Sequence, residues 1–163
     1  MSIVNPRQTI LVTTRSHATI MGREVLKDNI TATDWHSPVS HHPLVYGIFI
    51  GNDRISRELI EKSKVFIVNF IPKTLEKAAK MCRERHGHHM DKFIEGNVTK
   101  EEGTSVDCPR IKEALAYLEC ELIFQKEFGD HVFFAGKVRQ ADIKNDGHRL
   151  IHMSKDIYTT TER

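Results

Sequence analysis

The chain has 163 residues, which suits one domain, over residues 1–163, with a substantial hydrophobic core. Hydrophobic residues make up 39% and charged residues 28%, as in ordinary water-soluble proteins, and a formal net charge of +2 gives no support for nucleic-acid binding. We expect no membrane partner, because no apolar run approaches the roughly 18 residues that a spanning helix needs. Three scattered cysteines and no secretion signal favour a reducing, cytoplasmic location.

The first third of the chain predicts a hairpin followed by a loop. Residues 8–15 are rich in β-branched side chains and predict a strand, and Gly22 is a turn signal. Pro38 and Pro43 fix φ and remove backbone donors, so residues 37–43 are expected to form a loop.

Two buried strands and a short helix are expected next. Residues 44–51 and 64–71 are nearly continuous apolar runs, typical of strands that are buried on both faces. Between them, residues 55–63 predict a short helix with Ser56 as a candidate N-cap. The second strand carries one polar residue in its interior, Asn69.

The middle of the chain predicts two short helices and a polar stretch. Residues 74–82 place apolar side chains on one helical face, with Thr74 as the expected cap, and Gly87 interrupts the pattern. A further helical turn, closed by Gly96, precedes residues 97–110, which are polar and irregular.

The last third predicts a long antiparallel pair. Leu118, Cys120, Leu122 and Phe124 alternate along one face of a strand, and residues 132–143 are its expected partner across a tight turn. Residues 145–147, Asn-Asp-Gly, are a strong hairpin signal before a short strand and a polar tail. Roughly six or seven strands with short helical insertions indicate a mainly β fold, an antiparallel barrel.

None of the common dinucleotide, P-loop, zinc-protease or hydrolase motifs is present, so four weaker features remain. Residues 35–40, Trp-His-Ser-Pro-Val-Ser, offer hydroxyls and N–H groups in a proline-braced segment that could bond the edge of a heteroaromatic ring, although a plain turn with capping serines fits the same residues. Arg54 and Ser56 at a helix N-terminus could hold an anion, or they could be an ordinary cap beside a solvated arginine.

The third feature is the histidine-rich segment 82–93. Cys82, His86 and His89 could ligate a metal, but Gly87 breaks the helix that would align them and no Cys-x-x-Cys pair is present. The same segment could instead be a basic loop that meets a phosphate, or a solvated basic loop.

The fourth feature is His131, which follows Gly129 and Asp130 between two strands. A histidine at a strand end can lean over a pocket mouth and donate a hydrogen bond, or it can be a satisfied turn residue.

The ordered set of these segments resembles the flavin reductase-like, FMN-binding split-barrel family, including the flavoredoxins. The set is P-R-Q-T-I-L-V-T-T, N-I-T-A-T-D-W-H-S-P-V-S-H-H-P, R-I-S-R-E-L-I, V-F-I-V-N, D-K-F, L-E-C-E-L and G-D-H-V-F-F-A-G-K-V, and it covers nearly the whole chain. One departure is clear: where relatives often read C-G-x-x-S-G-R-x-x-D-K-F, this chain has Arg83, His86 and His88 in place of the family's Gly, Ser and Arg.

The resemblance implies a Greek-key split β-barrel that forms a homodimer and binds FMN near the dimer interface. It implies that the protein passes electrons from NADH or NADPH through FMN to a small acceptor or redox partner. A non-enzymatic FMN-binding electron carrier is the alternative, and a His-rich metal-binding module is a third hypothesis. The expected catalytic residue is His131, which would orient the substrate. The expected FMN-binding residues are Thr31, Trp35, Ser37, Pro38, Val39, Ser40, Arg54, Ser56, Asn69, His86, Gly87, His88, Lys92 and Phe93, with no metal ligand.

Overall fold

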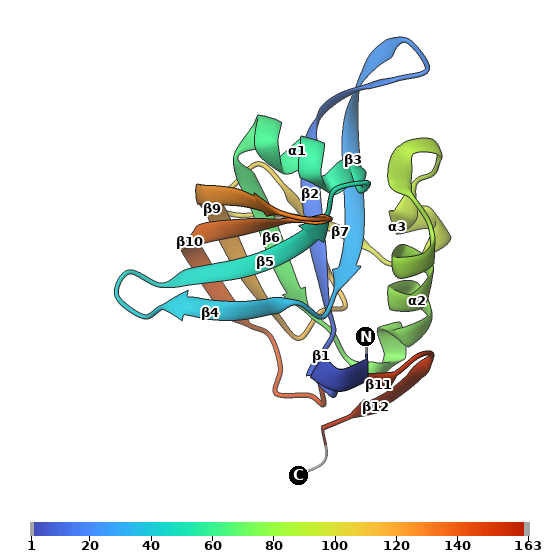
Figure 1. Ribbon diagram of the computed structural model, residues 1–163, viewed down its shortest axis with the longest axis vertical. Coiled ribbons are helices and arrows are strands. Elements are labelled where there is room, and N and C mark those ends of the chain that lie inside the picture. Colours follow the sequence, from blue (N-terminus) through green and yellow to red (C-terminus); the bar gives the residue numbers. More distant parts are fainter. Residues whose placement is uncertain (1, 162–163) are drawn as a thin grey trace.

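The computed structural model describes residues 2–161 and is dominated by antiparallel β-structure (Figure 1). Its strands are β1 (Arg7–Gln8), β2 (Ile10–Ile20), β3 (Arg23–Thr33), β4 (His36–Ser40), β5 (Val45–Gly51), β6 (Val65–Phe70), β7 (Lys100–Glu102), β8 (Pro109–Ile111), β9 (Ala116–Phe128), β10 (His131–Ile143), β11 (Leu150–Ser154) and β12 (Ile157–Thr160). The helices are α1 (Ile55–Ser63), α2 (Glu76–Glu84) and α3 (Lys92–Glu95), with 3₁₀ turns at Ser2–Val4, Lys73–Leu75 and Gly87–His89. No helix within residues 2–161 has the length and apolar character needed to cross a membrane.

Seven strands form one sheet in the order β3-β2-β6-β9-β10-β5-β4. Its two edge strands, β3 and β4, are consecutive in the chain and separated only by Asp34 and Trp35. The sheet must therefore curl until its edges meet, which leaves a split between β3 and β4 where no ladder forms. Across this split, Thr33 Oγ1 donates to Phe49 O (3.2 Å) and Phe49 N donates to Trp35 O (2.9 Å). The expected mainly β split barrel is confirmed.

The first half of β2 and most of β6 are buried on both faces because the sheet separates two cores. Ile10 and Val12 point into the barrel, where they pack with Phe66 and Phe134, all of them fully buried. Leu11, between them, faces the opposite way, as the two-residue period of a strand requires. Leu11 belongs to a second, outer core between the sheet and the helices. This outer core lies under α2 and α3, which cover β3 on one side of the barrel (Figure 1).

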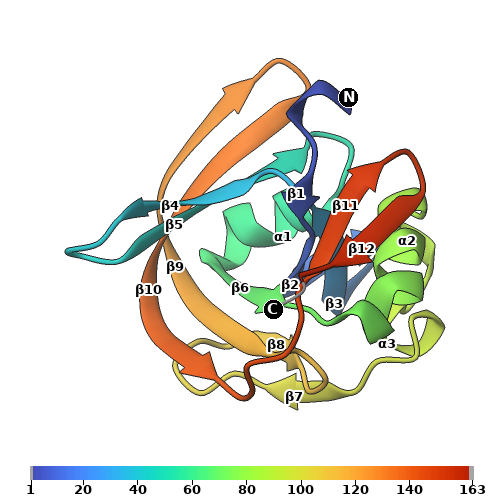
Figure 2. The same cartoon turned by 90° about the horizontal axis from the view of Figure 1, so that it is seen from below.

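A second, three-stranded sheet carries the end of the chain. It has the order β1-β11-β12, so the C-terminal hairpin pairs with the first strand and lies beside α2 (Figure 2). Tyr158 of β12 and Leu150 of β11 are buried in the outer core.

Most of the expected elements are present, but the loop expected at residues 37–43 is wrong. Residues 36–40 form β4, paired with β5, and only the turn that follows is irregular. Proline is tolerated in this strand because β4 lies at the edge of the sheet. The N–H group that proline lacks is then not needed for a hydrogen bond to a neighbouring strand.

The expected alternation along β9 fails at its distal end. A register shift opposite Ala135 and Gly136 leaves Ile123 without a partner, because Phe124 pairs with Ala135 and Leu122 with Gly136. Such a bulge reverses which face the later residues occupy, so Phe124 is 53% exposed rather than buried with Cys120.

Several local expectations are also wrong. Helix α1 begins after Arg54, so Ser56 lies inside the helix, and Leu75 rather than Thr74 precedes α2. Residues 97–110 contain β7 and the start of β8. The Asn-Asp-Gly segment 145–147 joins β10 to β11, which belong to different sheets, so it closes no hairpin.

Candidate functional site

A cavity of about 520 Å³ opens at the split of the barrel. It is lined by Asn5, Thr31, Ala32, Thr33, Asp34, Trp35, Phe49, Ile50, Gly51, Asn52, Asp53, Arg54, Arg83, Asp130, His131 and His152. The break in the sheet is therefore also the place where side chains from β3, β5, β10, α2 and β11 meet. Of the expected site residues, the cavity brings together Thr31, Trp35, Arg54 and His131.

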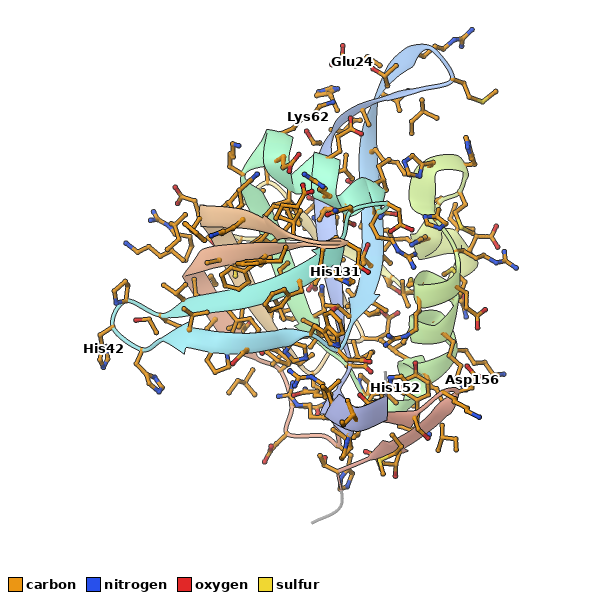
Figure 3. All side chains as sticks on the ribbon, viewed as in Figure 1. Glu24, His42, Lys62, His131, His152 and Asp156 are labelled. Carbon is orange, nitrogen blue, oxygen red and sulfur yellow. The ribbon has the colours of Figure 1, made fainter. Side chains whose placement is uncertain are left out.

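Trp35 and His131 form an aromatic pair in the cavity wall. Their ring centroids are 4.7 Å apart and their planes are inclined by 32°. Trp35 is 40% exposed, and His131 Nδ1 is hydrogen bonded to Asp130 Oδ1 at 2.7 Å. Figure 3 shows His131 facing β3, at the start of β10. The pair thus presents partly exposed flat surfaces at the cavity.

Arg54 joins the start of α1 to the end of α2. Its guanidinium donates to the carbonyl oxygens of Arg83 (2.6 Å) and Arg85 (3.1 Å), and its Nε lies 3.8 Å from Asp53 Oδ1. Carbonyls at a helix C-terminus carry partial negative charge, so this contact is favourable. It also fixes a cation in the cavity wall.

Beneath Arg54 lies a buried set of polar side chains. Ser56 is fully buried, and its hydroxyl contacts Thr31 Oγ1 (2.7 Å) and accepts from Asn29 Nδ2 (3.0 Å). Ser56 therefore supports Thr31 and does not itself line the cavity.

Lys92 is a fully buried cation. Its ammonium group donates to Ile30 O (2.9 Å) and Cys82 O (3.2 Å), and within residues 2–161 no carboxylate pairs with it. Burial, reinforced by the charges of Arg54 and Lys27, lowers the pKa of Lys92 to about 8. Lys92 thus lies behind the cavity wall, in a region with excess positive charge.

The neighbours of Lys92 have structural roles. Asp91 caps α3 by accepting from the backbone N–H groups of Phe93 (2.9 Å) and Ile94 (3.3 Å). Phe93 is buried in the outer core. The Asp-Lys-Phe segment is therefore a helix start that sends one charged side chain into the interior.

Gly87 and the histidines form the loop beside this region. A Cβ on Gly87 would lie 2.0 Å from Asn29 Oδ1, so the loop can approach β3 only with glycine there. His86 is exposed, and its Nε2 lies 3.8 Å from Asp53 Oδ2, whereas His88 is half-buried and does not line the 520 Å³ cavity. Residues 2–161 contain no group of three or more side chains arranged to hold a metal ion.

The remaining expected residues lie elsewhere. Ser37 lines a smaller cleft of about 280 Å³, which shares Trp35 and Phe49 with the main cavity, while Pro38 and Val39 are exposed on β4 and Ser40 ends that strand. Asn69 is fully buried: its amide donates to Leu11 O (2.9 Å) and its oxygen accepts from Ile111 N (2.9 Å).

Sequence reasoning missed a charged cluster in the cavity wall. Asp34 Oδ1 accepts from Thr9 Oγ1 (2.6 Å) and Arg83 Nη2 (2.7 Å), and Asp34 Oδ2 is paired with His152 Nδ1 (2.6 Å). Burial alone would raise the pKa of Asp34, but the Arg83 charge and these hydrogen bonds hold it below its usual value. The sequence signals were an aspartate directly before the single tryptophan and Arg83 in place of the family's glycine, whereas His152, 118 residues from Asp34, gave none.

The model of the family described as flavin reductase like domain matches residues 1–161. An uncharacterized protein of Pyrococcus abyssi is 32% identical over 110 residues, which cover 68% of this chain and 63% of that protein, so the chain spans under two thirds of this relative's length. The crystal structure of an FMN-binding protein from Thermus thermophilus with bound p-hydroxybenzaldehyde has a TM-score of 0.82 at 22% identity, covering 98% of this chain and 89% of that one. A flavin reductase in complex with NADP⁺ has a TM-score of 0.74 at 21% identity, covering 96% of this chain and 90% of that one.

Proposed function

Because the chain belongs to the flavin reductase-like domain family, we propose that it is an FMN-binding oxidoreductase that passes two electrons from NADH or NADPH to a small acceptor or a redox partner. The observation that carries the proposal is one cavity that combines the Trp35–His131 aromatic pair with the guanidinium groups of Arg54 and Arg83. A planar ring and a phosphate need these two kinds of surface.

Unpaired polar atoms in the cavity wall fit FMN. Arg83 Nε and Asn52 Oδ1 are buried and have no hydrogen-bond partner within the described part of the chain. Such atoms cost free energy when they stay unpaired, so a polar ligand that meets them stabilises the site. Arg83 would donate to the phosphate, and Asn52 would accept from a ring N–H or a hydroxyl.

Four of the other expected residues, Lys92, His86, Ser56 and Gly87, would contribute from behind or beside the cavity. Lys92 adds positive charge near Thr31 and Arg54, which favours a bound phosphate over long range. His86, whose Nε2 lies 3.8 Å from Oδ2 of Asp53 in the cavity lining, would contact the same group. Ser56 would act through Thr31, which its hydroxyl contacts, and Gly87 would act by leaving room for Asn29.

When bound, FMN would supply the two-electron chemistry, and the chain's own residues would orient the substrates. We expect His131 to contact the nicotinamide or the acceptor, because it is only partly buried and lies against Trp35 at the cavity. Its contact with Asp130 fixes the ring orientation. No side chain needs to transfer a proton for hydride transfer itself.

The test is an anaerobic mixing experiment on purified protein reconstituted with FMN. NADH or NADPH should bleach the flavin absorbance band, and adding an acceptor such as a ferric chelate or a quinone should restore it. A flavin band that persists with both nucleotides would instead support the electron carrier. Failure of the protein to bind FMN, together with stoichiometric zinc, would favour the metal-binding hypothesis.

We also propose that the protein forms a homodimer through the outer face of β4, β5, β9 and β10. Phe133 contacts Phe49 and Phe124 on this face, with ring centroids 4.9 Å and 6.4 Å away, and Phe124 and Phe128 are each 53% exposed. Phe128 pairs with His131 in the ladder, so the aromatic face continues to the cavity. An exposed apolar patch of this kind is typical of a protein interface.

A further inference from the structure

Asp34, Arg83 and His152 form a charged cluster in which Asp34 joins the two cationic side chains. All three line the cavity, and they come from the β3–β4 junction, α2 and β11. Asp34 is 6% exposed and His152 is 9% exposed. Charges that are buried away from water are weakly screened, so they interact strongly with a charged ligand in the cavity.

Both ring nitrogens of His152 face oxygen atoms that can accept hydrogen bonds. Nδ1 lies 2.6 Å from Asp34 Oδ2, and Nε2 lies 2.6 Å from the carbonyl oxygen of Lys155. A carboxylate and a carbonyl only accept hydrogen bonds. A neutral ring would set one nitrogen lone pair against an oxygen lone pair at 2.6 Å, so these two contacts favour a ring that carries a proton on each nitrogen.

The two other carboxylates of the cavity lining, Asp53 and Asp130, lie against Arg54, His86 and His131 rather than against this cluster. The cluster holds one anion, Asp34, and two cations, Arg83 and His152. Tyr158 stacks on His152 with centroids 4.6 Å apart, and burial raises the pKa of Tyr158, so its phenol is neutral. The net charge that the cluster presents to the cavity is therefore positive.

We propose that His152 is a fixed cation in the cavity wall that makes the site bind reduced FMN more tightly than oxidised FMN. This inference rests on the proposed FMN site. Two-electron reduction with uptake of one proton leaves the flavin with one additional negative charge, which a cation favours. Asp34 is then a positioning residue that holds the imidazolium at the cavity.

The experiment measures the dissociation constants of oxidised FMN and of dithionite-reduced FMN for the full-length protein at pH 7. His152→Gln should lower the preference for the reduced form about tenfold, which corresponds to about 30 mV for a two-electron couple. His152→Lys, which keeps the charge, should retain most of the preference. His17→Gln is the matched control, because the His17 side chain is 64% exposed on β2 and does not line the cavity.

A purely structural role would make the glutamine and lysine variants change the ratio equally or not at all, and that result would overturn the inference. If neither variant folds, ¹⁵N NMR of the wild-type imidazoles decides: a neutral His152 ring refutes the proposal, whereas two protonated nitrogens support it. Failure of wild-type protein to bind either form of FMN would instead refute the proposed function, and this inference with it.

Discussion

Lys92 shows how one residue can cost stability and still serve a site. Its ammonium group is fully buried with two carbonyl acceptors and no carboxylate partner within residues 2–161. A buried charge without a counter-ion is unfavourable, and the nearby charges of Arg54 and Lys27 increase the cost. A bound phosphate would relieve this cost.

The charge of Lys92 should destabilise the protein at neutral pH and stop doing so at alkaline pH. The pKa is 10.5 in its ordinary environment and about 8 in the folded protein, so the unfolded chain binds more protons between these values and stability rises with pH across them. The gap corresponds to roughly 3 kcal/mol at full effect. Urea unfolding at pH 7 and pH 10 should therefore show wild type gaining stability relative to Lys92→Met. A difference that is independent of pH would contradict a lowered pKa.

Arg54→Ala tests the phosphate contact directly. Loss of a charged hydrogen bond to the phosphate should weaken FMN binding by about 1.5–3 kcal/mol, measured by quenching of flavin fluorescence. Arg57→Ala is the matched control, because Arg57 lies one turn later on α1 and pairs with Glu61 and Glu127. Equal affinities for the two variants would remove Arg54 from the site.

At the level of elements, the loop after α2 is held against β3 by the absence of a side chain. The space where a Cβ of Gly87 would lie is filled by Asn29, whose amide also bonds Ser56. The loop, β3 and α1 are therefore coupled through a single buried amide group.

Gly87→Ala should destabilise the protein by about 1–3 kcal/mol, because the added methyl group collides with Asn29. The cost should be smaller in an Asn29→Ala background, where the obstructing amide is gone. Chemical denaturation of the four proteins in this double-mutant cycle measures the coupling. Additive effects would mean that the two residues do not meet.

At the level of the whole molecule, the curled sheet produces both the cavity and the aromatic outer face. The barrel splits where β3 and β4 adjoin, and the same curvature exposes Phe124 beyond the bulge in β9. A second copy on this face would lie next to His131, which pairs with Phe128. Dimerisation and substrate access would then be linked.

Phe124→Asp should shift the protein from dimer to monomer in light scattering, because it places a charge in the proposed interface. Ile157→Asp is the control, since Ile157 is 60% exposed but lies on the C-terminal hairpin. If the Phe124 variant remained dimeric, the interface would have to lie elsewhere.

The sequence by itself determined the strand-rich class, the positions of α1, β5, β6 and β9, and the resemblance that identified the family. These features depend on local periodicity and on ordered motifs, which neighbouring residues fully specify. It also indicated Trp35, Arg54 and His131, because each stands at the end of an element, where side chains reach a pocket.

Only the tertiary structure decided which other residues meet at the cavity. Asp34 and His152 are brought together by curling of the sheet and by docking of the C-terminal hairpin, and no local pattern encodes a contact across 118 residues. The burial of Ser56, Asn69 and Lys92 likewise follows from what packs over them. A polar residue near a site motif can either face the ligand or support the wall, and long-range packing alone settles which.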